Sequence, residues 1–384
     1  MANQKLAKDS LFKAAILFLP IIFYDPFFLA QLVFQPLRVG CFILLTTYLL
    51  FSNTRFTKIE PIFFFLLTLF GVLAVFRNSS DMTGLITIGN YILTFLFAWG
   101  LYRYLAGGRR RSEVLLGLYV AFFYIVVTCS LLSILYIEAL GEMDLFGLKS
   151  DIYGHLVTPF GMLFTKEMGP ITFYRSCFYF AEPQFVAIFY AANIVFVAPL
   201  LKDKARFFIQ ANLLGAFITM SLSFYVIAVV LHVVKKIKST FGFIVILIVV
   251  IGIMFFIEVM NSALQLSSDD RIERIYLFLV AMDAANIAQL WMGHGVAAET
   301  GFYKGFSSGL ALSIYETGCI GLALQVIMLF KLTQSLNIFI FFILAALIFD
   351  PIHIPLFWFL IIILSNTMKV EVFDSKKNYS IRYA

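Results

Sequence analysis

An arginine and a glutamate stand where a long polar segment meets an apolar one. Arg175 is followed, seven residues on, by Glu182, Pro183 and Gln184. A guanidinium offers a fork of donors that matches phosphate oxygens, although an Arg at the edge of a span also extends to the interface for solvation. Pro183 suits the first position of a helix, and Glu182 before it suits the positive helix end. Arg175 is therefore a candidate phosphate ligand, and Glu182 is a helix cap, an orienting carboxylate or a base.

A second polar segment carries two arginines at helical spacing. Arg271 and Arg274 lie within Ser267–Arg274, and they become i,i+3 neighbours if residues 270–285 are helical. Two guanidinium groups on one face suit a phosphorylated lipid head group. The same pattern also suits a solvated amphipathic helix on the membrane surface, so both interpretations stay open.

A histidine and a glutamate follow. His294 lies between Gly293 and Gly295, which predicts a turn that holds the imidazole at a loop tip, as an incidental residue or a base. Glu316 lies near the outer end of an apolar run, where a carboxylate is costly and marks either function or a satisfying partner. Gly318 follows it and allows close helix packing.

Motifs for metals, nucleotides and nucleic acids are missing from the sequence. There is no His, Cys, Asp or Glu spacing typical of Zn²⁺ or Mg²⁺, and the four cysteines form no CxxC pair. The net charge of +6 comes from short basic clusters between apolar runs, which is typical of orientation signals in membrane proteins. We therefore expect chemistry without a metal or cofactor, and no nucleic-acid partner.

The composition predicts that a lipid bilayer surrounds this chain. Of its 384 residues, 62% are hydrophobic and 13% are charged, whereas soluble domains have about 45–50% apolar and about 25% charged residues. We predict one polytopic domain over 1–384, an all-α integral membrane protein. The candidate spans are 11–29, 36–51, 61–76, 85–105, 114–137, 183–201, 240–259, 308–330, 335–349 and 354–366.

The stretch 205–234 is predicted to cross the membrane twice. A single crossing would put the basic cluster Lys235–Lys238 outside, against the positive-inside rule. Two short helices meeting near Met220–Ser223 restore the rule, whereas the alternative is one long tilted helix. Each of these two helices would reach only ~20 Å, short of the ~30 Å hydrocarbon core. The count is then about twelve spans, with both termini in the cytoplasm and long outer loops at about 138–182 and 260–307.

The order of these motifs resembles the Wzy-type O-antigen polymerase and O-antigen ligase superfamily. The resemblance covers about residues 170–330 and consists of the following, in this order: Arg175 to Glu182–Pro183, Ser221–Leu222–Ser223, Arg271 with Arg274, Met292–Gly295, and Tyr315–Gly321. It implies a membrane-embedded, GT-C-like glycosyltransferase of a bacterial inner membrane, independent of metals and acting at the periplasmic face.

The resemblance also implies the substrate and the roles of the residues. The donor is an oligosaccharide linked to undecaprenyl diphosphate, and a chain-length regulator protein is an expected partner. Arg175, with Arg271 or Arg274, would bind the diphosphate and stabilise the leaving group. Glu182 or His294 would activate the acceptor hydroxyl, and Glu316 would contribute to substrate binding.

One departure from the family's pattern favours polymerase over ligase. Ligases of the superfamily usually carry a His-Asn pair just before the span near 308, where this chain has Lys304–Ser308. A second departure is Phe224, which stands after Ser223 where many members have an arginine, and it argues against a phosphate-binding role for this position. The alternatives are an O-antigen ligase, a multi-span transporter or flippase of lipid-linked sugars, and a non-enzymatic partner in polysaccharide export.

Overall fold

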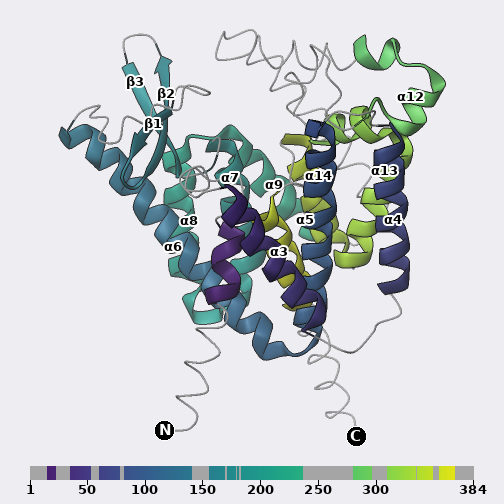
Figure 1. Cartoon of the computed structure of the whole chain (residues 1–384). Coiled ribbons are helices and arrows are strands. Elements are labelled where there is room, and N and C mark those ends of the chain that lie inside the picture. Colours follow the sequence, from purple (N-terminus) through teal and green to yellow (C-terminus); the bar gives the residue numbers. More distant parts are fainter. Residues whose placement is uncertain are drawn as a thin grey trace, which may run out of the picture. The chain divides into compact units, whose positions relative to one another are not determined.

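The structure is a computed structural model, and the residues that it describes are mostly helical with a small sheet (Figure 1). It describes residues 15–22, 35–52, 60–77, 82–140, 155–168, 171–178, 180, 183–236, 280–295, 309–333, 335–348 and 354–367. The chain divides into two compact units, which we describe separately. The first comprises Met1–Leu45, Gly107–His232 and Thr367–Ala384, and the second comprises Thr46–Ala106 and Val233–Asn366.

Helices occupy the predicted spans that fall on described residues. Residues 15–22 are helical within the first predicted span, and a helix covers Pro355–Thr367 in the last. The span predicted at 240–259 lies outside the described residues. The other helices at predicted spans are α3 (Gln35–Phe51), α4 (Glu60–Arg77), α5 (Met82–Ala106), α6 (Arg109–Leu140), α7 (Pro183–Ala192), α13 (Gly309–Thr333) and α14 (Leu336–Ile348).

Length and composition make three of the described helical stretches long and apolar enough to cross a membrane. They are Arg110–Leu140, Phe185–Thr219 and Gly309–Thr333. Shorter apolar helices cover Leu37–Phe51, Pro61–Leu73, Leu336–Ala346 and Pro355–Thr367. These helices define a helical, membrane-embedded protein, and the count of about twelve crossings stays a prediction.

The first unit is built around a reversal of the chain at Lys202. α7 continues through a π-helix (η1, Asn193–Val197) and a 3₁₀ segment (η2, Ala198–Lys204), in which Lys202 has φ 49° and ψ −114°. α8 (Ala205–Thr219) then returns beside α7, so that a Cβ added at Gly215 would lie 2.5 Å from the Tyr190 ring. The reversal falls in the basic cluster Lys202–Arg206, as expected between two crossings.

A chain of buried side-chain hydrogen bonds joins α6, η1 and α8. The Tyr119 hydroxyl donates to Asn193 Oδ1 at 2.9 Å, and Asn193 Nδ2 donates to Asn212 Oδ1 at 2.7 Å. Asn212 Nδ2 in turn donates to the Phe208 carbonyl at 2.7 Å. Buried amides are tolerated only when hydrogen-bonded, so these partners fix how the three helices meet.

A three-stranded antiparallel sheet covers one end of these helices, and it departs from the all-helical architecture that the sequence predicted (Figure 1). Its strands are β1 (His155–Thr158), β2 (Gly161–Met168) and β3 (Ile171–Phe178), in sequence order. Thr158 Oγ1 donates to Ser133 Oγ of α6 at 3.0 Å. The segment 138–182, predicted as a loop, therefore begins with the last turn of α6 and contains a meander fixed to that helix.

The second unit has an aromatic core. Phe70 of α4 meets Tyr91 and Phe95 of α5 edge to face, with ring centroids 5.9 and 5.7 Å apart. Trp358 is fully buried and contacts Phe95 and Phe342 at 5.5 and 5.4 Å. α13 packs against α4, α5 and α14.

Candidate functional site

A helix break lies where the sequence predicted that 205–234 turns. α8 ends at Thr219, Met220 adopts the left-handed conformation (φ 46°, ψ 38°), and α9 (Leu222–Lys236) begins two residues later. The predicted break near Met220–Ser223 is confirmed. The double crossing of the membrane stays a prediction, because the break alone does not establish where the two helices lead.

Arg175 lies beside this break. It stands on β3 opposite Phe164 of β2, and its Nε donates to the Thr219 carbonyl at 2.9 Å. The last carbonyls of a helix have no partner within the helix and carry partial negative charge. The guanidinium therefore caps α8, and its position is set by both the sheet and the helix end. This gives Arg175 a structural role that the sequence did not predict.

The second helix break lies in α13 of the second unit. Gly318 has φ 65° and ψ −173° within Gly309–Thr333, a conformation that interrupts the hydrogen-bond ladder of the helix. Free carbonyls inside an apolar span must find other donors. The interruption comes two residues after Glu316 and three after Tyr315. The sequence predicted that Gly318 allows close helix packing, and in the structure Gly318 also breaks the helix.

The loop Gly293–Gly295 supplies those donors. It follows the short helix α12 (Ile287–Met292), which begins with a capping box between Asn286 and Gln289. The N–H of His294 donates to the Tyr315 carbonyl at 2.8 Å, and the N–H of Gly295 donates to the Glu316 carbonyl at 3.0 Å. The loop thereby replaces the missing bonds of α13.

The two backbones meet through glycines. A Cβ added at Gly293 would lie 2.1 Å from the Glu316 oxygen, and one added at Gly318 would lie 2.5 Å from the Gly293 nitrogen. Gly293 and Gly295 also have φ values of 78° and 108°, which glycine adopts without steric cost. The sequence signal for this contact was the pair of glycines around His294.

The His294 imidazole is held on the same break. Its ring stacks on Tyr315 with centroids 4.2 Å apart and planes inclined by 10°. Nδ1 lies 3.3 Å from the Tyr315 carbonyl oxygen. A carbonyl only accepts, so this contact requires a proton on Nδ1, and in the neutral ring Nε2 is then the basic nitrogen. The geometry therefore presents the atom that a general base needs.

Glu316 is buried with a tyrosine hydroxyl as its partner. Its side chain is 1% exposed, and Tyr91 of α5 donates to Oε2 at 2.7 Å. Seven residues separate Glu316 from the start of α13, which places it about 10 Å along the helix. A buried carboxylate requires such donors, and Tyr91 has no sequence signal that would have identified it within an apolar run.

The structure brings together two of the six predicted site residues. His294 and Glu316 meet in the second unit through the loop and the α13 break, whereas Arg175 belongs to the first unit. Glu182, Arg271 and Arg274 lie outside the described residues. Sequence reasoning missed Tyr91, Tyr315 and Thr219, which are the partners of the predicted residues.

The fold and these two helix breaks define a polytopic helical membrane protein. Comparisons with protein-family models, curated proteins and solved structures gave no match. The similarity to the polymerase and ligase superfamily therefore rests on the order of motifs in the sequence.

Proposed function

We propose that this protein polymerises oligosaccharide repeat units linked to undecaprenyl diphosphate at the periplasmic face of a bacterial inner membrane. The observation that carries the proposal is the docking of Gly293–Gly295 onto the α13 break, at 2.8 and 3.0 Å. Two motifs that the resemblance orders along the chain, 20 residues apart, are in direct contact in the structure. This contact supports a shared site for His294 and Glu316.

The reaction is a glycosyl transfer. A hydroxyl oxygen of the acceptor attacks the anomeric carbon of the donor sugar, and the bond from that carbon to the diphosphate oxygen breaks. Undecaprenyl diphosphate leaves with the electron pair, and a base takes the hydroxyl proton. His294 Nε2 is suited to accept that proton. The resemblance assigns to Arg175 the stabilisation of the charge that develops on the diphosphate.

The arrangement of the first unit supports the proposal that Arg175 lies at the periplasmic face of the membrane. α6 begins in the basic run Arg109–Arg111 and the chain reverses at Lys202, whereas β1–β3 and the Met220 break lie at the other end of these helices. If the basic ends are cytoplasmic, Arg175 is on the periplasmic side, where polymerisation of such repeat units would occur.

The test is chain extension by the purified protein. A lipid-linked repeat unit is incubated with the protein in detergent with a chelator present, and the products are separated by size. The proposal predicts a ladder of longer lipid-linked chains. A second reaction also contains a lipid A core as acceptor, and transfer to that core with no ladder in either reaction would instead identify a ligase.

One observation favours the transporter alternative. α13 is interrupted at Gly318 beside a buried carboxylate, and discontinuous helices also form the binding sites of transporters. Proteoliposomes loaded with a fluorescent lipid-linked sugar distinguish the two. Movement of the intact lipid between leaflets without chain extension would replace the polymerase proposal with a flippase.

A further inference from the structure

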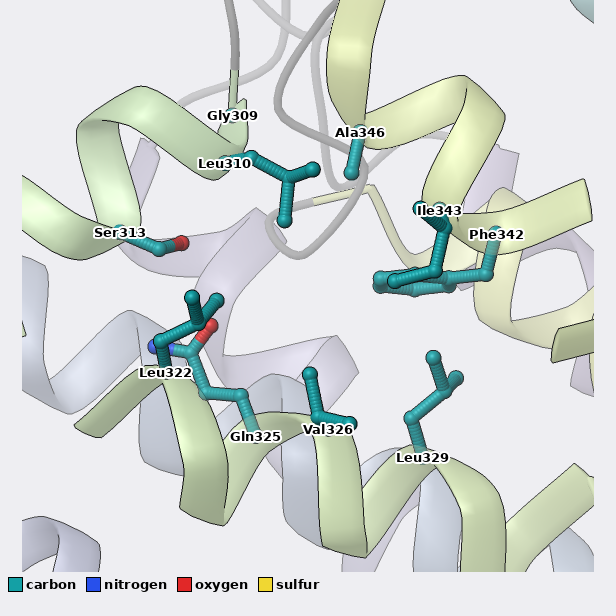
Figure 2. A pocket seen from close by; sticks show the side chains of 10 residues that line it. All are labelled: Gly309, Leu310, Ser313, Leu322, Gln325, Val326, Leu329, Phe342, Ile343 and Ala346. Atoms are coloured by element: carbon teal, nitrogen blue, oxygen red, sulfur yellow. The ribbon is translucent and has the colours of Figure 1, made fainter. Parts of the chain in front are cut away.

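A cavity lies between α13 and α14, beside the α13 break (Figure 2). Residues from both sides of Gly318 line it. Most of the lining is apolar and includes Leu310, Leu322, Val326, Leu329, Phe342 and Ile343.

Two polar side chains point into this apolar space. Ser313 and Gln325 are 1% and 5% exposed, and Figure 2 shows the Gln325 amide turned back towards Ser313. Within the described part of the chain, Ser313 Oγ and both Gln325 Nε2 and Oε1 have no hydrogen-bond partner. Both residues line the same cavity, so one small molecule held there would lie beside both side chains.

A buried amide without partners is strongly unfavourable in an apolar environment, and an aliphatic residue would fill the site at lower cost. The ligand must offer both a donor and an acceptor, because Gln325 presents one of each. The cavity is narrow, and the room at its centre is about that of one water molecule. A sugar or a lipid head group is too large.

We propose that this cavity holds an ordered water molecule that bridges the Gln325 amide and the Ser313 hydroxyl inside the membrane. Buried waters typically make about three hydrogen bonds to polar groups that lack other partners. Water beside an interrupted helix is also a recognised way to complete the polar contacts at a kink. The bridge links the two halves of α13 across Gly318, and it does not depend on the proposed enzymatic activity.

Radiolytic footprinting of the purified protein tests the proposal. X-ray pulses generate hydroxyl radicals from water in place, and mass spectrometry locates the modified side chains. Phe342 lines the cavity and is 5% exposed, whereas its neighbour Phe341 is 0% exposed and does not line it. We expect Phe342 to be modified several-fold faster than Phe341, and we expect Gln325→Leu to remove that difference.

Ser313→Ala is the second variant, because it removes only a hydroxyl and should preserve the fold if Gln325→Leu does not. Slower modification of Phe342 in Ser313→Ala would support the bridge. Equal modification of Phe341 and Phe342 in the wild-type protein, or unchanged modification of Phe342 in a folded variant, would show that the cavity is dry and overturn the proposal.

Discussion

The backbone N–H of Gly295 donates to the carbonyl oxygen of Glu316 at 3.0 Å. The next bond, from His294 to Tyr315, is 2.8 Å long, so a loop and a broken helix form one hydrogen-bonded structure. Because Glu316 is also bound by Tyr91, the position of the loop and the position of a buried carboxylate depend on each other.

Alanine at Gly293 or Gly318 should separate the loop from α13. The added Cβ would meet backbone atoms at 2.1 Å and 2.5 Å, and positive φ adds about 1–3 kcal/mol of strain for other residues. We expect both variants to unfold at lower temperature in detergent than the wild-type protein and to lose chain extension.

Gly89→Ala in α5 is the matched control, because a Cβ there has no atom within 4 Å. It should leave both the unfolding temperature and chain extension unchanged. Wild-type stability in Gly293→Ala would show that the loop does not contact α13 as described.

Tyr91→Phe should destabilise the second unit through Glu316. The variant keeps the ring that packs on Phe70 at 5.9 Å and removes only the hydroxyl that donates to Oε2. A buried acceptor that loses its donor costs about 1–3 kcal/mol. Thermal unfolding in detergent measures the change.

In a Glu316→Gln background, Tyr91→Phe should change the unfolding temperature by a different amount than in the wild-type protein, because an amide then replaces the carboxylate to which the Tyr91 hydroxyl donates. A double-mutant cycle gives the coupling free energy between Tyr91 and Glu316. Tyr48→Phe is the control, since Tyr48 is 53% exposed. Additive effects within about 0.3–0.5 kcal/mol would show that the hydrogen bond contributes nothing.

Arg175 is predicted to have two separable roles. Arg175→Ala removes the bond from Nε to the Thr219 carbonyl and, under the proposed function, the contact with the diphosphate. We expect chain extension to be abolished with protein levels intact. At least one of Arg271→Ala and Arg274→Ala should also abolish it, because losing a charge-assisted contact costs on the order of a few kcal/mol.

Arg175→Lys distinguishes the roles. Lysine retains a donor for a helix end, but its point charge does not reproduce a bidentate fork. We expect near wild-type stability with little recovery of chain extension. Arg206→Ala is the control, because Arg206 is exposed at the start of α8. Full activity in Arg175→Ala would remove this residue from the mechanism.

The sequence predicted much of the helical architecture because apolar runs and basic clusters are local signals. It predicted the start of α7 at Pro183 and the break near Met220, and both are confirmed. It did not predict the sheet at 155–178, whose strands pair with each other in the described part of the chain and rest on α6. Short strands that depend on such support leave a weak periodic signal.

The candidate site was harder to predict, because contacts over long separations are not encoded locally. The glycines around His294 indicated a turn, and the depth of Glu316 indicated a partner, but nothing linked the two residues. Tyr91 lies 225 positions from Glu316 and resembles the other aromatic residues of its span. Only the packing of α5 against α13 identifies it as the partner.

The base is the last prediction, and His294 and Glu182 are the candidates. The contact of Nδ1 with the Tyr315 carbonyl at 3.3 Å leaves Nε2 as the proton acceptor in the neutral ring. His294→Asn keeps a side-chain N–H near Nδ1 and removes Nε2. If Nε2 is the base, this variant should fold normally and extend chains about 10²–10⁴-fold more slowly, because a base contributes about that factor.

Glu182 is tested in the same assay. Glu182→Gln keeps the shape and the ability to bind an arginine but cannot take a proton. Near-normal extension by Glu182→Gln together with failure of Glu182→Ala would assign Glu182 to positioning Arg175, with His294 as the base. Failure of both Glu182 variants while His294→Ala and His294→Asn remain active would make Glu182 the base. Normal extension by all four variants would remove both residues from the proton transfer, because neither side chain would then be required at the rate-limiting step.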